Sequence, residues 1–296
     1  MENYVSLIID IERSKSFEVN VRNEIQTYIA DCIIRLNDLF KENMECSVTF
    51  SAGDELQGLF NDAVAAVLYF RLFEILMNPV KVRAGIGIGE WTVKIENGLS
   101  TQQDGPVYHR ARRAIEEVHK AQFQNIRILS VADDIWVNHL MNASLILKRQ
   151  QINTQNLVQV IIELLYPFVT KNMSWSDMNK IKELLEIKYK NGPKSFSVAG
   201  KTRNNLEDRN VDIDEITVID AILIDGKIKD VEDIILKKNM TAIVSKILGC
   251  TRQNVDSIVR RGNVNKIREL DYMALQYIAQ KYGGEDDINY IGTHFR

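Results

Sequence analysis

The first 130 residues alternate between short apolar runs and longer segments with helical periodicity. Val5–Ile11 and Val80–Ile88 are apolar runs of strand length, and the first is rich in isoleucine. Apolar residues recur at helical spacing over Phe17–Phe40, and Ala63–Met77 is apolar enough to form a second, more deeply buried helix. Ser47–Phe60 has strand character on both sides of a glycine, so we expect a hairpin there.

The order of these elements is typical of one kind of sheet. Asp104-Gly105-Pro106 is a good helix start, and this helix is expected to run to about Ala121. Ile126–Leu129 is a last short strand, and Trp91–Ile95 is a candidate to pair with the strand before it. Strand-helix-strand-strand-helix-strand is the ferredoxin-like order, which palm domains share. We therefore predict an α+β fold that begins with a ferredoxin-like palm domain, an antiparallel sheet with helices on one face.

After about residue 131 the pattern becomes mostly helical. Leu145–Val169 and Met178–Tyr189 carry apolar residues at helical spacing. Residues 191–214 are polar and contain glycine and proline, which predicts a loop or hinge, whereas Val211–Leu236 alternates acidic and apolar residues and is expected to be helical. The predicted domains are a palm domain over 1–130, a helical middle region over 131–238 with the polar loop near 191–214, and an all-α domain with a helix-turn-helix over 239–296.

The composition restricts the classes of function. The chain has 296 residues, and its net charge of -3 gives no global attraction to nucleic acid or to membranes. Its three cysteines form no CxxC, which argues against a disulfide framework or a zinc site and for a reduced cytoplasm. The longest apolar stretch is interrupted by Arg71 and Glu74, so we expect a buried helix and no membrane partner. The N-terminus lacks the pattern of a signal peptide, and a cytoplasmic protein is predicted.

Two carboxylates are expected at one edge of the sheet. Asp10 lies near the end of the first apolar run, and Asp54 directly follows the hairpin glycine. If the strands pair, two neighbouring like charges need a neutralising partner, and a divalent cation that carries a nucleoside triphosphate supplies one. Aspartates at strand ends also cap helices and turns, which is the structural alternative. The candidate metal ligands are Asp10, Ile11 and Asp54, the expected cofactor is Mg2+ or Mn2+, and the candidate nucleotide-binding residues are Glu12, Arg13, Lys15, Gly53 and Glu55.

A glycine-rich strand and a basic helix start form the next two motifs. Val82–Glu90 has glycine at alternate positions, which favours either tight packing of a helix on the sheet or a floor for a flat base or a partner subunit. Gly105–Arg113 places basic side chains in the first two turns of a helix, where the dipole favours anions, and His109 and Arg113 share one face. A polyphosphate ligand explains these residues, and the alternative is a solvated or salt-bridged face.

The C-terminal segment Thr241–Arg261 has the pattern of a helix-turn-helix. Gly249 falls at the turn, Thr251 can cap the second helix, and apolar residues fall where the two helices must pack. The unit is expected to bind DNA through residues 241–261, although the same kind of unit also serves as a protein-docking module. The candidate DNA-binding residues are Arg252, Gln253, Asn254, Ser257, Arg260 and Arg261, and Lys237, Lys238, Lys246, Lys266 and Arg268 add local basic charge.

The first half of the chain resembles the class III nucleotidyl cyclase and diguanylate cyclase superfamily of palm domains. Asp10-Ile11 followed by Phe17 resembles the first metal-binding strand, and Gly53-Asp54-Glu55 resembles the second metal hairpin. Val82–Glu90 resembles the cyclase strand of similar glycine pattern, and Gly105–Arg113 resembles the helix that supplies the transition-state residues. The resemblance implies a head-to-tail homodimer, because class III palms place this helix across the subunit interface.

The resemblance also assigns roles to individual residues. It implies that Asp10 and Asp54 hold two divalent ions, that Arg113 stabilises charge on the transferred phosphorus, and that His109 orients the ribose or the α-phosphate. The combination of an S-x-G-D-E-x-Q-G hairpin, DGPxxHRARRAIE and a C-terminal helix-turn-helix resembles the SatD family of bacterial proteins most closely. This second resemblance covers residues 1 to about 130 and 239–282.

Three functions are consistent with these patterns. The first is a metal-dependent palm protein that binds a nucleoside triphosphate, acts as a nucleotidyl cyclase and is fused to a helix-turn-helix module. The second is a nucleotide-sensing transcriptional regulator without catalytic turnover. The third is a docking protein in which both sites are vestigial. All three stay open at this point.

Overall fold

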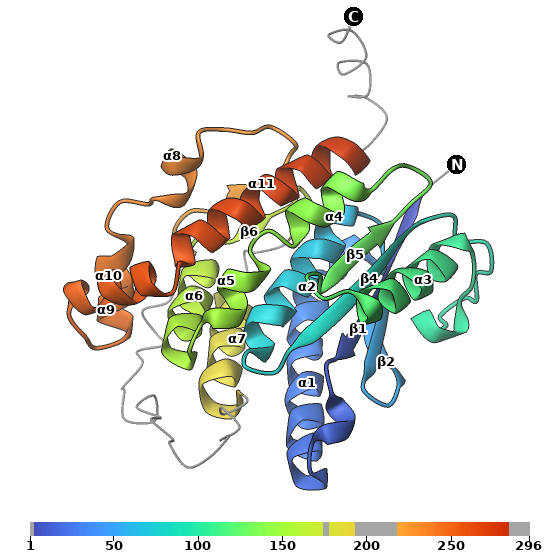
Figure 1. Ribbon diagram of the computed structural model, residues 1–296, viewed down its shortest axis with the longest axis horizontal. Helices are drawn as coiled ribbons and strands as arrows, with labels where there is room; N and C mark the ends of the chain where they lie inside the picture. Colours follow the sequence, from blue (N-terminus) through green and yellow to red (C-terminus); the bar gives the residue numbers. More distant parts are fainter. Residues whose placement is uncertain (1–2, 174–177, 193–217, 284–296) are drawn as a thin grey trace, which may run out of the picture.

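β1 (Tyr4–Ile11) is the central strand of a five-stranded sheet whose order is β2-β3-β1-β4-β5. The computed structural model describes residues 3–173, 178–192 and 218–283 (Figure 1). β2 (Met44–Ala52) and β3 (Glu55–Phe60) form the expected hairpin, and β1 is antiparallel to both β3 and β4 (Val82–Gly89). β5 (Ile126–Leu129) is parallel to β4, so the sheet is mixed and the prediction of an antiparallel sheet was wrong at this edge.

Helices cover both faces of the sheet, which corrects the expectation of helices on one face only. α1 (Val19–Leu39) and α2 (Ala63–Met77) pack with the odd-numbered residues of β1, such as Leu7 and Ile9, in the main hydrophobic core. α3 (Pro106–Lys120) covers the opposite face, where Ile8 packs against Ala111 and Ile115. Because side chains alternate along a strand, one apolar strand serves both helical layers. β1 is therefore buried along nearly its whole length.

The glycines of β4 let α3 approach the sheet closely. A Cβ added at Gly87 would lie 2.1 Å from the carbonyl oxygen of Val107, and one at Gly85 would lie 2.3 Å from the backbone nitrogen of Ile115. Any side chain at these positions would therefore collide with the backbone of α3. Of the two interpretations of the glycine pattern, tight packing of a helix on the sheet is the one that the structure contains.

Two segments after β4 differ from their predictions, Trp91–Ile95 and Leu145–Val169. Trp91–Ile95 is not a strand paired with β4, because its only ladder contact is an isolated bridge between Val93 and Asp104. The long helix expected over Leu145–Val169 is two helices, α5 (Leu145–Gln150) and α6 (Asn153–Leu165), followed by the short strand β6 (Phe168–Val169). α4 (Ile135–Met141) precedes them, and α7 (Met178–Asn191) agrees with its prediction.

The region predicted to be helical over Val211–Leu236 is mostly irregular where the structure describes it, from residue 218 on. β7 (Ile222–Leu223) pairs in parallel with β6, and the only helix there is the short α8 (Val231–Ile235). Ile222 and Ile224 are buried while Leu223 between them is exposed, which is the two-residue period of a strand. The part after the palm is therefore not all-α. Most of the predicted loop, residues 193–214, lies outside the described residues.

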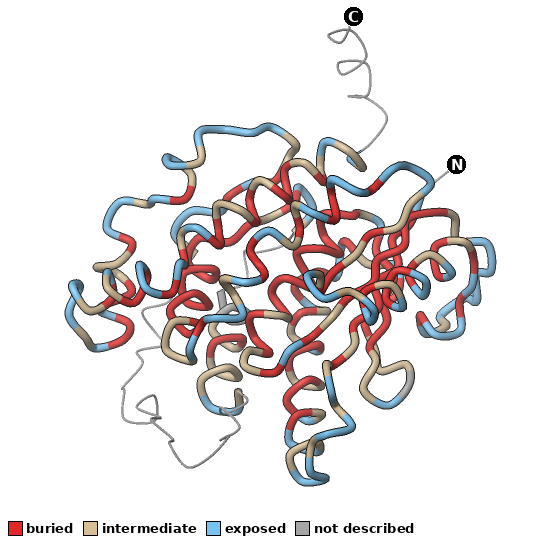
Figure 2. The backbone as a smooth tube through the Cα atoms, viewed as in Figure 1, coloured by how far each residue is buried: buried red, intermediate tan, exposed pale blue. Residues whose placement is uncertain are grey.

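A buried ionic cluster joins the N-terminal layer to the C-terminal helix α11 (Val264–Tyr282). Arg71 on α2 donates to Asp271 on α11 at 2.6 Å, and Glu163 on α6 accepts hydrogen bonds from both Arg71 and Arg268. These four side chains are at most 6% exposed, and Figure 2 shows buried stretches along α2, α6 and α11. Arg268 thus belongs to the interior, and its assignment to a basic surface was wrong.

Lys188 on α7 makes the stability of the fold depend on pH, and this dependence can be measured. Its ammonium group donates to the carbonyl oxygens of Leu76, at 2.8 Å, and Asn78, and it forms no ion pair within the described residues. Burial lowers the pKa of Lys188 from 10.5 to about 7. The unfolded chain therefore binds more protons than the folded one between about pH 7 and 10.5, so stability rises with pH in that window.

We expect the free energy of unfolding to rise by about 2 kcal/mol between about pH 7 and 9 in the wild type, relative to Lys188→Met. Urea denaturation at each pH measures the difference. Lys190→Met is the matched control, because Lys190 lies on the same helix but is exposed and paired with Glu186. An identical pH dependence in the wild type and Lys188→Met would contradict the prediction.

Candidate functional site

The pairing of β1 with β3 brings the two acidic segments to one edge of the sheet. Ile9 stands opposite Leu56, so the chain beyond Ile9 runs alongside the turn that precedes Leu56. That turn contains Gly53, whose φ of +66° is in the left-handed region that favours glycine. Asp10 and Asp54 therefore come from neighbouring strand ends, as the motif spacing predicts.

The carboxylate of Asp10 already has two basic partners. Its Oδ2 accepts a hydrogen bond from Arg83 at 2.9 Å and lies 3.1 Å from Nε2 of His119. Arg83 is directly opposite Asp10 on β4, and His119 is in the last turn of α3, which covers this face. The side chain of Asp10 is 18% exposed, so the ion pair with Arg83 is largely shielded from water. A protein guanidinium thus supplies the positive charge beside Asp10.

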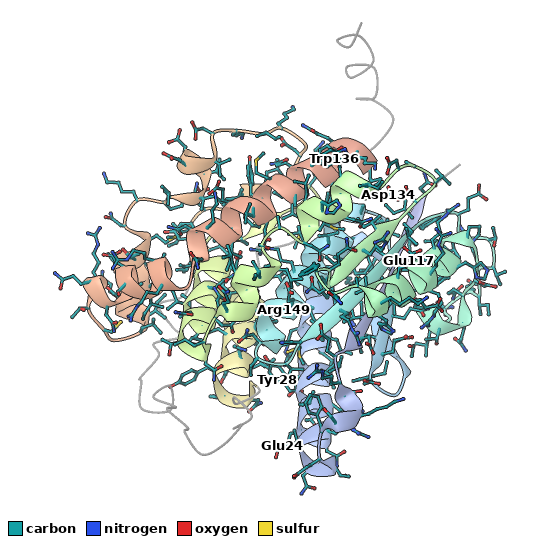
Figure 3. All side chains as sticks on the ribbon, viewed as in Figure 1. Glu24, Tyr28, Glu117, Asp134, Trp136 and Arg149 are labelled. Carbon is teal, nitrogen blue, oxygen red and sulfur yellow. The ribbon has the colours of Figure 1, made fainter. Side chains whose placement is uncertain are left out.

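The other predicted acidic residues at this edge are neutralised in the same way. Both carboxylate oxygens of Glu55 accept from Arg112 on α3, at 2.5 and 2.7 Å, and this bidentate pair raises the pKa of the Arg112 guanidinium. Glu12 accepts from Arg149 on α5 at 2.6 Å, and Figure 3 shows Arg149 between α5 and the sheet. Asp54 differs, because its carboxylate has no hydrogen bond or ion pair within the described part of the chain.

This donor set does not fit a resident divalent cation as it stands. No group of three or more His, Cys, Asp or Glu side chains that could hold a metal ion occurs among the described residues. Three of the four carboxylates at the edge are bonded to arginines, which a cation would have to displace. Mg2+ and Mn2+ need several free oxygen ligands. The assignment of Asp10, Ile11 and Asp54 as metal ligands stays a prediction.

The predicted phosphate-binding and catalytic residues lie on exposed surfaces. Arg13, with a φ of 58°, and Lys15 are exposed at the short 3-10 turn η1 (Ser14–Ser16) that follows β1. His109 is 3.4 Å from Asp104, and Arg113 pairs with Glu117 at 3.0 Å within α3. The side chains of His109 and Arg113 are 74% and 71% exposed. These contacts match the alternative of a salt-bridged helix face, and the catalytic roles stay a prediction.

Four basic residues of this edge were not among the predicted site residues: Arg83, Arg112, His119 and Arg149. Arg83 could have been found from the two predicted strands that contain it and Asp10. When these strands are aligned antiparallel in the observed register, Arg83 lies opposite Asp10. Helical spacing puts His119 one turn beyond Ile115, which packs on the sheet. For Arg149 there was no such signal, because 137 residues separate it from Glu12.

At the other end of the molecule, α9 (Met240–Ile247) and α10 (Arg252–Arg261) are joined by a short turn (Figure 1). Gly249 adopts a φ of +56° at that turn, and the hydroxyl of Thr251 accepts from the backbone nitrogen of Asn254 at 3.3 Å, which caps α10. Apolar residues of the two helices are buried where the sequence predicts contact, including Val244, Leu248, Val255 and Ile258.

The outer face of α10 is polar and basic. Arg252, Gln253, Arg260 and Arg261 are exposed, and Asn254 and Ser257 are partly buried. Arg252 lies 3.7 Å from Asp256, and Arg261 donates to the backbone oxygen of Ser257 at 3.3 Å. The side chain of Arg260 has no hydrogen bond or ion pair with any residue that the structure describes. The role of these residues in DNA binding stays a prediction.

None of the helices in the described ranges combines the length and the apolar character needed to cross a bilayer.

Comparisons with known proteins identify the family. Two solved structures of a bacterial light-regulated adenylyl cyclase are similar to this chain, each with a TM-score of 0.31 and 15% sequence identity. Each alignment covers 43% of this chain, and 74% of one cyclase chain and 42% of the other. No curated protein matches the chain. The model of the SatD family matches residues 4–202, and the chain belongs to that family.

Proposed function

We propose that this protein is a DNA-binding regulator whose sheet edge binds a nucleoside triphosphate without turning it over. The outer face of α10 is the observation that carries this proposal. Arg252, Gln253, Arg260 and Arg261 are exposed there on a capped helix that follows a tight turn. A helix held in this way can enter the major groove, with Arg and Gln reading base edges and arginines at its end binding phosphates.

The geometry of the sheet edge supports a nucleotide ligand. The end of β1 and the Gly53-Asp54 turn lie side by side, and Arg13 and Lys15 are exposed just beyond β1, where they could bind phosphate oxygens. The ion pair between Asp10 and Arg83 favours binding without turnover, because it occupies a carboxylate that metal-assisted phosphoryl transfer would need.

Nucleotidyl cyclase activity is the second candidate function. One observation favours it, namely that the carboxylate of Asp54 has no partner in the described part of the chain and lies beside the end of β1. In this case Asp10, the backbone of Ile11 and Asp54 would hold Mg2+ or Mn2+, and Glu12, Gly53 and Glu55 would line the nucleotide. Arg113 and His109 would then act across a homodimer interface, so this candidate requires a dimer.

The test combines nucleotide and DNA binding on the full chain. We expect at least one nucleoside triphosphate, with or without Mg2+ or Mn2+, to raise the melting temperature of the protein. Selection from a random duplex library and fluorescence anisotropy are expected to give nucleotide-dependent binding that is tighter than nonspecific binding, which is about 10⁻⁴–10⁻⁶ M. Arg260→Ala should weaken DNA binding about tenfold and lower the salt slope by about one, because one phosphate contact is lost.

The matched control is Arg113→Ala, which removes another exposed arginine at the opposite end of the molecule and should leave DNA affinity unchanged. Failure to bind DNA tighter than nonspecifically, with or without nucleotide, would remove the regulator proposal. Product analysis decides between the two candidates. Release of pyrophosphate that is abolished by Asp54→Asn would establish the cyclase, and light scattering measures the dimer that it requires.

A further inference from the structure

A pocket of about 230 Å³ opens where the sheet layer meets the helices that follow it. It lies between the end of α2, the turn at Asn78-Pro79, the start of β4 and the segment from α5 to α6. It contains none of Asp10, Asp54 or Glu55, so it is separate from the carboxylates discussed above, although Arg149 borders both regions.

Two of the residues that line this pocket carry a buried amide oxygen that accepts no hydrogen bond. Asn156 is 2% exposed, and its side-chain nitrogen donates to the carbonyl oxygen of Ile75 at 3.1 Å, which leaves Oδ1 as the free acceptor. Oδ1 of Asn78 is buried and unpartnered as well. A buried acceptor without a partner costs free energy that a donor group in the pocket would recover. No residue that the structure describes therefore supplies a donor to either of these two oxygens.

The rim of the pocket is basic. Lys81 is exposed and has no ion pair with a residue that the structure describes. The guanidinium of Arg149 lies 2.6 Å from Glu12 and is 30% exposed, which leaves donors for a second partner. The acidic residue of the lining, Glu74, is already bonded to Lys148 and Asn125. The charged groups that remain available to a ligand are therefore the cations at the rim. The acceptors without a partner are buried.

We infer that this pocket binds a free α-amino acid. An ammonium group supplies the donors that Asn156 and Asn78 lack, and a carboxylate meets Lys81 and Arg149. The volume is below the roughly 300 Å³ at which drug-sized sites begin. Lys148 and Glu74 of the lining also connect the pocket to the ionic cluster, because Lys148 lies 3.2 Å from Asp271. An amino acid bound here strengthens the junction between the sheet layer and α11.

The test is thermal melting and calorimetry of the full chain with the proteinogenic amino acids at up to about 10 mM, where a site with a Kd of about 0.1 mM gives clear stabilisation. At least one amino acid is expected to bind, and its amide or its deaminated carboxylate should bind at least about tenfold more weakly. Lys81→Met should lower the affinity at least about fivefold, because it removes an exposed cation at the rim. Lys41→Met, an exposed lysine outside the pocket, should not change it.

Asn156→Leu should abolish binding, and if that variant does not fold, Lys81→Met decides. The inference is overturned if no amino acid raises the melting temperature, which would mean that water alone satisfies the two amides. It is also overturned if Lys81→Met binds as tightly as the wild type, because the ligand would then lie elsewhere. Neither result bears on nucleotide or DNA binding, which are measured with other ligands.

Discussion

Glu163→Gln is expected to lower the free energy of unfolding by about 3–5 kcal/mol, the usual cost of removing one partner from a buried ion pair. Glu163 is 1% exposed and lies between Arg71 and Arg268. Neutralising it leaves two guanidinium groups buried with one carboxylate, Asp271, whose charge is also shared with Lys148. A domain stabilised by about 5–15 kcal/mol would lose a large part of its stability. Urea denaturation followed by circular dichroism measures the loss.

Two comparisons separate the buried charge from general effects of substitution. Glu42→Gln changes an exposed glutamate and should shift stability by less than about 0.5 kcal/mol. The double variant Glu163→Met with Arg268→Met should lose less than the sum of the two single variants, because it removes a complete pair and leaves Arg71 with Asp271. A Glu163→Gln variant as stable as the wild type would show that the cluster is not a buried ionic network.

The same cluster predicts how the protein responds to acid. Burial alone would raise the pKa of Glu163, but Arg268 and Arg71 together hold it below its usual value of 4.5. The folded state thus binds this proton less tightly than the unfolded state, so the stabilisation is present above about pH 4.5 and is lost as the pH falls further. Glu163→Gln removes this contribution, and its acid transition should be shallower than that of the wild type.

The sequence predicts local elements well here because local signals decide them. The strands from β1 to β5 and the helices α1 to α3 follow apolar periodicity, glycine turns and one proline helix start. Periodicity does not show which side of the sheet a helix covers, so the placement of α3 was missed. A charge in a helical pattern likewise looks like a surface residue. Glu163 is buried because Arg268, 105 residues further along the chain, meets it in space.

The candidate site shows the same limit. The motif spacing correctly indicated that the ends of β1 and β3 meet, because each of the two strands carries its own local sequence signal. It could not show that Arg83, Arg112 and Arg149 would neutralise Asp10, Glu55 and Glu12, since each partner comes from a different element. The residue types at the edge were therefore predictable, whereas their electrostatic state depends on tertiary packing.

Gly87→Ala is expected to destabilise the protein by about 3 kcal/mol, at the upper end of overpacking effects. The new Cβ would lie 2.1 Å from the carbonyl oxygen of Val107 and 2.3 Å from the backbone nitrogen of Ala111, so α3 as a whole must move away from the sheet. The shift also loosens the contacts of α3 with the sheet edge, namely His119 with Asp10 and Arg112 with Glu55. Hydrogen exchange should therefore rise along α3 and β4.

Gly53→Ala is the matched control, because it makes the same chemical change at a position where there is room for a side chain. Glycine is favoured there only by the backbone conformation. No atom lies within 4 Å of the added Cβ there, and the φ of +66° accounts for a cost of about 1–2 kcal/mol. Protection of α3 should stay unchanged in that variant. The explanation for the glycines of β4 fails if Gly87→Ala lowers the free energy of unfolding no more than Gly53→Ala does. It also fails if Gly87→Ala leaves hydrogen exchange along α3 unchanged. Close packing at Gly87 is thus what holds α3, and with it Arg112 and His119, over the acidic edge of the sheet.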